Sequence, residues 1–266
     1  MANHALIIPA LNPDERLLQL VKEVQAIAPG LQIIIVDDGS GPAHGQIFDQ
    51  LKFAYDCILC RHHENYGKGA AIKTGIDHMK RYFPGCAGYI TADADGQHRP
   101  ADILKVAKAL QQHPDHLILG TRDFSQKQVP FKSFWGNRIT SGVFRLITGR
   151  SCPDTQTGLR GIPARYAELA LEVSGERFEY EMNFLMTAAQ NRVPFLEVPI
   201  STVYLEGNRS SHFRPVRDSA RIYGTILKFL VRPLHRQRKI RKIAVPKVPV
   251  AAASQQYEET SVIQEV

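Results

Sequence analysis

The chain has 266 residues, with 33 Lys and Arg against 26 Asp and Glu, which gives a formal net charge of +7 and a pI near 9.3. Its 44% apolar and 22% charged residues exclude a wholly disordered, collagen-like or coiled-coil chain. Four cysteines are too few for a disulfide scaffold. Because no secretory leader and no run of about 18–20 uncharged apolar residues is visible, we expect a cytoplasmic protein without a membrane span.

The first half of the chain alternates short apolar runs with helical patterns. Continuous apolar runs, typical of parallel strands covered on both faces, span residues 5–8, 33–36, 57–60, 89–91 and 117–119. Apolar residues at helical spacing lie between them, over residues 17–27, 72–83 and 103–110. This order predicts an α/β fold with a mostly parallel sheet flanked by helices.

The second half is less regular. It reads as an aromatic-rich, cationic helix over residues 131–147, a polar loop over 154–160, a helix over 179–190 and strand material over 195–204. Residues 251–266 lack apolar periodicity and are expected to be disordered. We therefore expect one domain over residues 1–232, followed by a basic and then polar tail over 233–266 that is largely disordered.

Three polar clusters follow predicted strands directly. They are residues 9–12, the pair Asp37 and Asp38, and residues 93–98. In open α/β sheets, ligands bind beyond the carboxyl ends of the strands. The three clusters should therefore meet in one crevice.

The segment 93–98, DADGQH, carries the strongest chemical signal. In an extended segment the side chains of Asp93, Asp95 and Gln97 point the same way, which presents two carboxylates and an amide oxygen. Such oxygen ligands suit Mg²⁺ or Mn²⁺. An ordinary Asp-Gly surface turn is the alternative, but carboxylates that follow a buried strand need a cation or hydrogen-bond donors.

Two further loops are candidates for the same ligand. Asp37 and Asp38 are placed to accept hydrogen bonds from a ribose or a base edge, and a tight turn that caps the next helix is an equal alternative. Residues 65–69, NYGKG, place the cation Lys68 just before a helix, where it could hold phosphate. The spacing is not that of a P-loop.

Together these segments resemble family 2 glycosyltransferases with the GT-A fold, and most of all the dolichyl- or polyprenyl-phosphate sugar synthase branch. The matching strings are IPALN at 8–12, IIVDDGS at 34–40, NYGKG at 65–69 and DADGQH at 93–98. The resemblance covers residues 4–230. It implies that Pro9, Asn12, Asp37 and Asp38 hold the nucleoside of a sugar nucleotide, and that Asp93, Asp95 and Gln97 hold the divalent metal on its diphosphate. Leu11-Asn12-Pro13 stands where the family usually has Tyr-Asn-Glu, so base recognition is expected to differ.

Later segments extend the resemblance: GTR at 120–122, NR at 137–138, DTQTGLR at 154–160, EYEM at 179–182 and GNRSSH at 207–212. By analogy, Arg122, Arg138 and Arg209 contact acceptor phosphate or the departing diphosphate, whose growing charge needs neutralising. A lipid-phosphate acceptor needs no general base, whereas a hydroxyl acceptor needs a carboxylate. Glu181 is the candidate base, with a surface glutamate as the alternative. His212 is a candidate metal ligand or phosphate donor, with a plain surface histidine as the alternative.

The charge is concentrated near the end of the chain. Residues 209–247 hold 12 Lys and Arg and one acid, whereas the rest of the chain has 21 basic and 25 acidic residues. An apolar stripe from Val216 to Leu234 accompanies these cations, a pattern that suits an anionic membrane surface. A solvated face is the alternative. Nucleic acid is a weaker prediction because aromatics are few and no recognised motif is present.

The sequence thus predicts a metal-dependent, inverting glycosyltransferase at the inner face of the cytoplasmic membrane. It would move a hexose from a UDP- or GDP-linked donor to a polyprenyl-phosphate acceptor, using Mg²⁺ or Mn²⁺. The alternative acceptor is a glycan hydroxyl of the cell envelope. A sugar nucleotidylyltransferase is disfavoured because residues 9–12 lack a Gly-rich basic loop, and a non-catalytic membrane-surface protein is the remaining class.

Overall fold

The computed structural model describes residues 3–123 and 131–201, and the side chains of residues 131–135 are outside this description. The strands are β1 (His4–Ala10), β2 (Gln32–Asp37), β3 (Ile58–Arg61), β4 (Gly88–Thr91), β5 (Leu117–Arg122), β6 (Arg160–Pro163) and β7 (Phe195–Ile200). The α-helices are α1 (Glu15–Ile27), α2 (Gly45–Phe53), α3 (Lys68–Tyr82), α4 (Pro100–Gln112), α5 (Phe131–Thr148), α6 (Ala167–Glu172) and α7 (Glu179–Gln190). Two 3₁₀ turns, η1 (Pro42–His44) and η2 (Ala164–Tyr166), precede α2 and α6.

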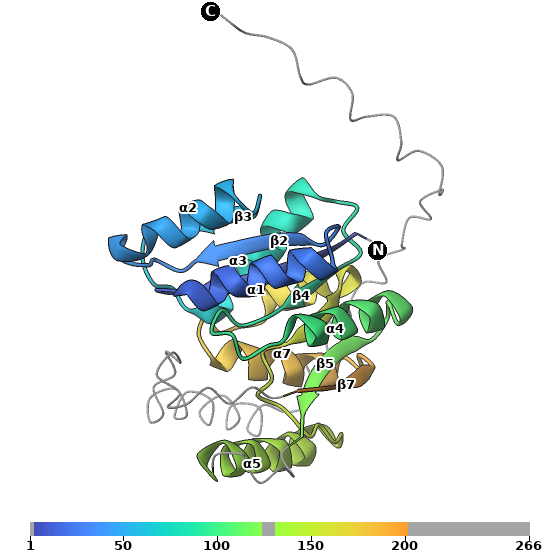
Figure 1. The fold of residues 1–266 in the computed structure, drawn as a ribbon. Coiled ribbons are helices and arrows are strands. Elements are labelled where there is room, and N and C mark those ends of the chain that lie inside the picture. Colours follow the sequence, from blue (N-terminus) through green and yellow to red (C-terminus); the bar gives the residue numbers. More distant parts are fainter. Residues whose placement is uncertain (1–2, 124–130, 202–266) are drawn as a thin grey trace, which may run out of the picture. The chain divides into compact units, whose positions relative to one another are not determined.

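The described strands form one sheet in the order β3-β2-β1-β4-β6-β5-β7 (Figure 1). All neighbouring pairs are parallel except those of β6, which runs antiparallel to both β4 and β5. The predicted α/β class and mostly parallel sheet are confirmed. The loop predicted over 154–160 ends one residue early, because Arg160 pairs with Thr91 and Leu119 and begins β6.

Helices cover both faces of this sheet, which explains why its strands are continuously apolar (Figure 1). On one face Ile7 lies in a core cluster with Ile76 of α3 and residues of α6 and α7. On the other face the next residue, Ile8, joins a second cluster with Leu17 of α1 and residues of α2 and α4. Side chains alternate between the two faces as strand geometry requires, so β1 is buried on both sides.

Helix α3 comes especially close to β1. A Cβ atom at Gly75 would lie 2.5 Å from Cγ2 of Ile7, so only glycine permits this approach. Because α3 begins at Lys68, this tight packing also fixes the position of Lys68 relative to the sheet. The helix therefore serves as a rigid support for the loop before it.

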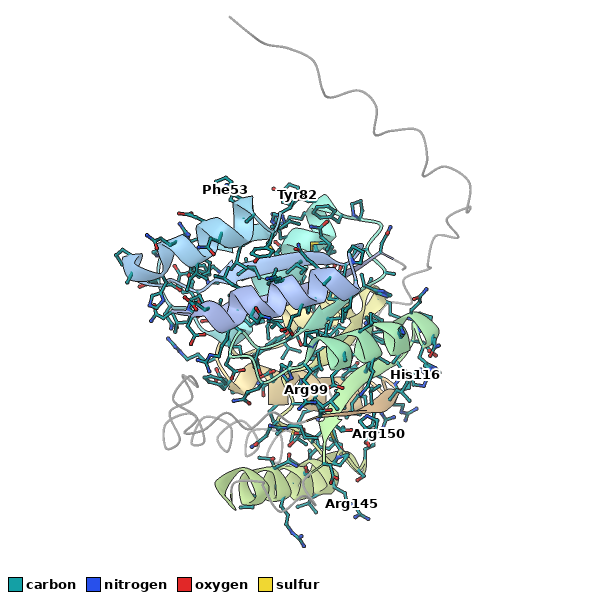
Figure 2. All side chains as sticks on the ribbon, viewed as in Figure 1. Phe53, Tyr82, Arg99, His116, Arg145 and Arg150 are labelled. Atoms are coloured by element: carbon teal, nitrogen blue, oxygen red, sulfur yellow. The ribbon has the colours of Figure 1, made fainter. Side chains whose placement is uncertain are left out.

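The exposed aromatic side chains of α2 and α3 lie away from the predicted ligand site. Phe53 and Tyr82 stand at the carboxyl ends of their helices (Figure 2), which is the edge of the sheet where the strands begin. No helix of the described residues is both long and apolar enough to cross a membrane. The predicted basic helix and the tail lie outside the described residues.

Candidate active site

Several of the predicted site residues lie at one edge of the sheet. β1, β2, β4 and β5 are mutually parallel in direction, so their carboxyl ends bring Asn12, Asp38, Asp93 and Arg122 to this edge. Because β6 runs the opposite way, the loop before it reaches the same edge. The sheet therefore unites segments from positions 9 to 160 in one region.

Asn12 joins the loops that follow β1 and β2. Its backbone adopts a positive φ of 46°, and its N–H donates to Ser40 Oγ at 2.8 Å. The Asn12 side-chain oxygen in turn accepts from the Gly41 N–H at 2.9 Å. These reciprocal bonds fix the two loops that the resemblance assigns to the nucleoside, and Pro9 precedes them within β1.

Asp37 closes β2 and is almost completely buried. One carboxylate oxygen accepts from the Ser40 N–H at 2.8 Å, and the other accepts from Arg61 Nε at 2.9 Å. The Asp37 side chain is 3% exposed and that of Arg61 is 53% exposed. Asp37 therefore shapes the turn that carries Ser40, and its contact with a nucleoside stays a prediction.

Asp38 holds the loop that contains NYGKG. Its Oδ1 accepts from His62 Nδ1 at 2.8 Å and from the Tyr66 N–H at 3.0 Å, while Oδ2 accepts from the Gly67 N–H at 2.8 Å. The other nitrogen of His62 lies 2.9 Å from Thr74 Oγ1 on α3. Asp38 thus ties the end of β2 to the start of α3, in addition to the nucleoside contact that the resemblance predicts.

We expect Asp38→Asn to lower the free energy of unfolding by about 2–4 kcal/mol, because an amide group would face donors in a buried position. The donor KM should rise about tenfold as the 62–67 loop loosens. Urea denaturation and donor titration measure the two effects. Asp49→Asn, on the exposed face of α2, is the control and should stay within about 0.5 kcal/mol of the wild type. An unchanged Asp38→Asn protein would contradict this role.

Lys68 links three elements through one ammonium group. Its Nζ lies 2.6 Å from Asp93 Oδ1 and 3.0 Å from Glu181 Oε2, so α3, the segment after β4 and α7 meet there. Burial alone would lower the pKa of Lys68, but the two carboxylates outweigh burial and raise it. Burial likewise opposes ionisation of Asp93, yet Lys68 and His98 hold the pKa of Asp93 well below its usual range. His98 Nε2 lies 3.2 Å from Asp93 Oδ2.

Asp95 differs from Asp93 in its electrostatic surroundings. Burial and the nearby charge of Asp93 raise the pKa of Asp95, and its Oδ1 accepts from the Gln97 N–H at 3.0 Å. Among the described residues Asp95 has no ion pair within 4.0 Å, and a nearby cation is Arg16, whose pKa is raised by its hydrogen bond to Asp14 and also by the charge of Asp95. A cation at this point would relieve the repulsion between the two carboxylates.

The donor set suits a divalent ion that also binds phosphate. In the part of the chain described, no three His, Cys, Asp or Glu side chains form a metal-binding group. The resemblance assigns the ion to Asp93, Asp95 and the Gln97 amide, whose segment turns at residues 94–96 instead of running extended as the sequence predicted. Mg²⁺ and Mn²⁺ commonly bind through one or two carboxylates plus substrate phosphates. The residues present therefore fit such an ion.

Arg122, at the end of β5, forms a bidentate ion pair with Asp154. Its Nε and one terminal nitrogen donate to the two oxygens of Asp154 at 2.7 and 2.9 Å, and its backbone N–H donates to Asp154 Oδ2 at 3.2 Å. Asp154 is fully buried. Arg138 is exposed on α5, and Arg209 and His212 lie outside the described residues. Phosphate contacts by these arginines stay predictions.

The loop before β6 presses against Asp93. Thr91 Oγ1 donates to the Gly158 carbonyl at 2.8 Å, and a Cβ at Gly158 would lie only 2.4 Å from Asp93 Oδ2. Arg160, buried at the start of β6, donates to the carbonyls of Thr157 and Glu181 at 3.0 and 2.8 Å. The loop and α7 are thus fixed around the carboxylate cluster.

Sequence reasoning assigned no site role to His98, Asp154 or Arg160, although all three are buried at this edge. All three stand inside the motif strings DADGQH and DTQTGLR, which is the signal that the sequence offers, but their partners are set by tertiary contacts. The pairing of Lys68 with Glu181 joins residues 113 positions apart, and no pattern in the chain indicates it.

The fold is that of GT-A glycosyltransferases. Glucosyl-3-phosphoglycerate synthase from Mycobacterium tuberculosis, crystallised with Mn²⁺, uridine diphosphate and glucosyl-3-phosphoglycerate, superposes with a TM-score of 0.63. That likeness covers 87% of this chain and 81% of the synthase chain at 15% sequence identity, so it bears on the fold alone.

Sequence comparison gives the family. The model of glycosyl transferase family 2 matches residues 5–161, and this chain belongs to that family and is a glycosyltransferase. The UDP-N-acetylglucosamine–dolichyl-phosphate N-acetylglucosaminyltransferase of Methanococcus voltae is 32% identical over 222 residues, covering 76% of this chain and 86% of the relative. The polyprenol monophosphomannose synthase of Mycolicibacterium smegmatis is 28% identical over 205 residues, covering 74% and 76%.

Proposed function

We propose that the protein is a metal-dependent, inverting transferase that moves a hexose from a UDP- or GDP-linked donor to a polyprenyl phosphate at the inner membrane surface. The observation that carries the proposal is the meeting of Asp93, Asp95 and Lys68 at the edge where the β1 and β2 loops also lie. The names of the two relatives, a dolichyl-phosphate N-acetylglucosaminyltransferase and a polyprenol monophosphomannose synthase, support the acceptor class.

The residues divide into a donor end and a reacting end. Asn12 and Asp37 shape the loops for the nucleoside, and Asp93, Asp95 and Gln97 would hold Mg²⁺ or Mn²⁺ beside the diphosphate. The ion would neutralise charge that develops on the departing diphosphate. Arg122, with Arg138 and Arg209, would add positive charge for the same group or for the acceptor phosphate.

The reaction proposed needs no base from the protein when the acceptor is a phosphate. A phosphate oxygen is already anionic, so it forms the new bond to the anomeric carbon as the bond to the donor diphosphate breaks, with inversion. Glu181, the candidate base for a hydroxyl acceptor, is 11% exposed in its side chain and bound to Lys68. This pairing favours the phosphate acceptor over the glycan alternative.

The test is transfer from radiolabelled UDP- and GDP-sugars to polyprenyl phosphate in the presence of Mn²⁺. We expect organic-phase label with polyprenyl phosphate and none with the matched polyprenyl alcohol, which lacks the anionic nucleophile. Transfer only to a soluble glycan would refute the lipid-phosphate assignment. Full activity in EDTA would refute the metal requirement.

Membrane attachment is proposed to rest on the basic segment after residue 208, because its cations and apolar stripe suit anionic lipid. Flotation with anionic vesicles compares the full chain with a chain ending at residue 232. Equal flotation of both chains would remove residues 233–266 from the attachment.

A further inference from the structure

Lys68 occupies the place where a divalent ion would meet Asp93. Its ammonium nitrogen lies 2.6 Å from Asp93 Oδ1, while His98 Nε2 lies 3.2 Å from the other oxygen. Both oxygens of Asp93 therefore already face a nitrogen. The Lys68 side chain is 16% exposed and that of Asp93 is 27% exposed, so water screens this ion pair only partly.

An ammonium group and a divalent ion cannot share this oxygen without cost. Mg²⁺ approaches its oxygen ligands to about 2.0–2.1 Å. Two cations held on one carboxylate repel each other strongly in a partly buried site. Binding of the ion through Asp93 therefore requires Lys68 to move.

Glu181 offers Lys68 a second position. Its Oε2 already lies 3.0 Å from the ammonium nitrogen, and its Oε1 is buried with no hydrogen-bond partner in the part of the chain described. An unpaired buried carboxylate oxygen is costly, so it favours the approach of a donor. A shift of Lys68 toward Glu181 would satisfy that oxygen and free Asp93.

We propose that Lys68 is a resident counter-ion that competes with the divalent ion for Asp93 and moves to Glu181 when the ion enters with a nucleotide diphosphate. Free ion then binds weakly, because it must displace Lys68 without help, whereas the diphosphate supplies compensating negative charge. This makes Lys68 a positioning residue. The inference rests on the proposed metal role of Asp93 and Asp95.

The test measures binding of Mn²⁺ alone to the full chain, from the loss of the free-ion signal in electron paramagnetic resonance. Two variants are compared with the wild type: Lys68→Met, and Lys68→Met combined with Glu181→Gln. The double variant loses one positive and one negative charge, so the cluster keeps its net charge while Asp93 is freed. We expect Mn²⁺ to bind at least tenfold more tightly to both.

Lys73→Met is the matched control, because Lys73 is on the same helix but its ammonium group donates to the Gly175 carbonyl at 3.0 Å. Its Mn²⁺ affinity should stay within twofold of the wild type. Should Lys68→Met fail to fold, the charge-balanced double variant decides alone. If the double variant binds Mn²⁺ no more tightly than the wild type, the inference is overturned. This holds even if the single variant alone binds Mn²⁺ more tightly, because its change in net charge would then explain the gain.

A further arm separates this inference from the proposed function. Wild-type protein is titrated with Mn²⁺ in the presence of UDP or GDP. If the wild type binds Mn²⁺ with a nucleotide but the variants show no higher affinity for Mn²⁺ alone, only the competition by Lys68 is overturned. No binding with either nucleotide overturns the metal role itself and the inference with it.

Discussion

Replacing Asp95 by asparagine is expected to lower kcat/KM for sugar transfer about a thousandfold, a loss of roughly 4 kcal/mol of transition-state stabilisation. Asp95 is the carboxylate of the pair that has no ion-pair partner among the described residues, so its charge is available for a divalent ion. The asparagine amide keeps the shape of the carboxylate but lacks its negative charge. Steady-state transfer assays at saturating Mn²⁺ measure the loss.

The same substitution should not lower the melting temperature of the metal-free protein. Burial and the charge of Asp93 already disfavour the ionised form of Asp95, so the neutral side chain removes a repulsion. Asp115→Asn, exposed before β5, is the control for both measurements. Activity of Asp95→Asn within tenfold of the wild type would contradict the metal role.

The second large effect is expected at Gly158. Alanine there would place a Cβ 2.4 Å from Asp93 Oδ2 and 2.8 Å from Oδ1. Asp93 has a short side chain that is held by Lys68 and His98, so the carboxylate or the loop must shift. A displacement of about 1 Å at a reacting site lowers the rate about a hundredfold, and overpacking costs about 1–3 kcal/mol of stability.

Gly142→Ala provides the comparison. Gly142 is exposed on α5, and among the described residues no atom outside the backbone of its own helix turn and its two chain neighbours lies within 4 Å of the added methyl group, so the helix should gain about 0.5–1 kcal/mol. Thermal unfolding and transfer assays on the two variants together measure both effects. A Gly158→Ala enzyme with transfer within threefold of the wild type would show that the contact with Asp93 does not matter.

The part of the fold that follows from local pattern was predicted well. The strands β1, β2, β4 and β5 are continuous apolar runs that end in polar residues, and parallel packing brings those ends together. β6 could not be predicted in the same way. Its four residues include Arg160, Gly161 and Pro163, and it becomes a strand because β4 and β5 pair with it on either side.

The candidate site divides along the same line. Asp93, Asp95 and Gln97 are candidates from the sequence because their spacing is local and they follow a buried strand, and their metal role stays a prediction. The partners of Asp38, Arg122 and Lys68 could not be predicted from the sequence, because each partner is distant in the chain. They are His62, Asp154 and Glu181, respectively. Such pairings depend on tertiary packing, about which periodicity and composition carry no information.

The reversed direction of β6 also separates the chain connections into two groups. Among the described residues, the connections at the carboxyl edge, including the one before β6, carry candidate site residues, whereas those at the opposite edge carry none of them. Residues 113–116, between α4 and β5, belong to the second group and carry the exposed His113 (Figure 2 marks His116). A fluorophore or surface tether attached there would leave the candidate site at the carboxyl edge uncovered.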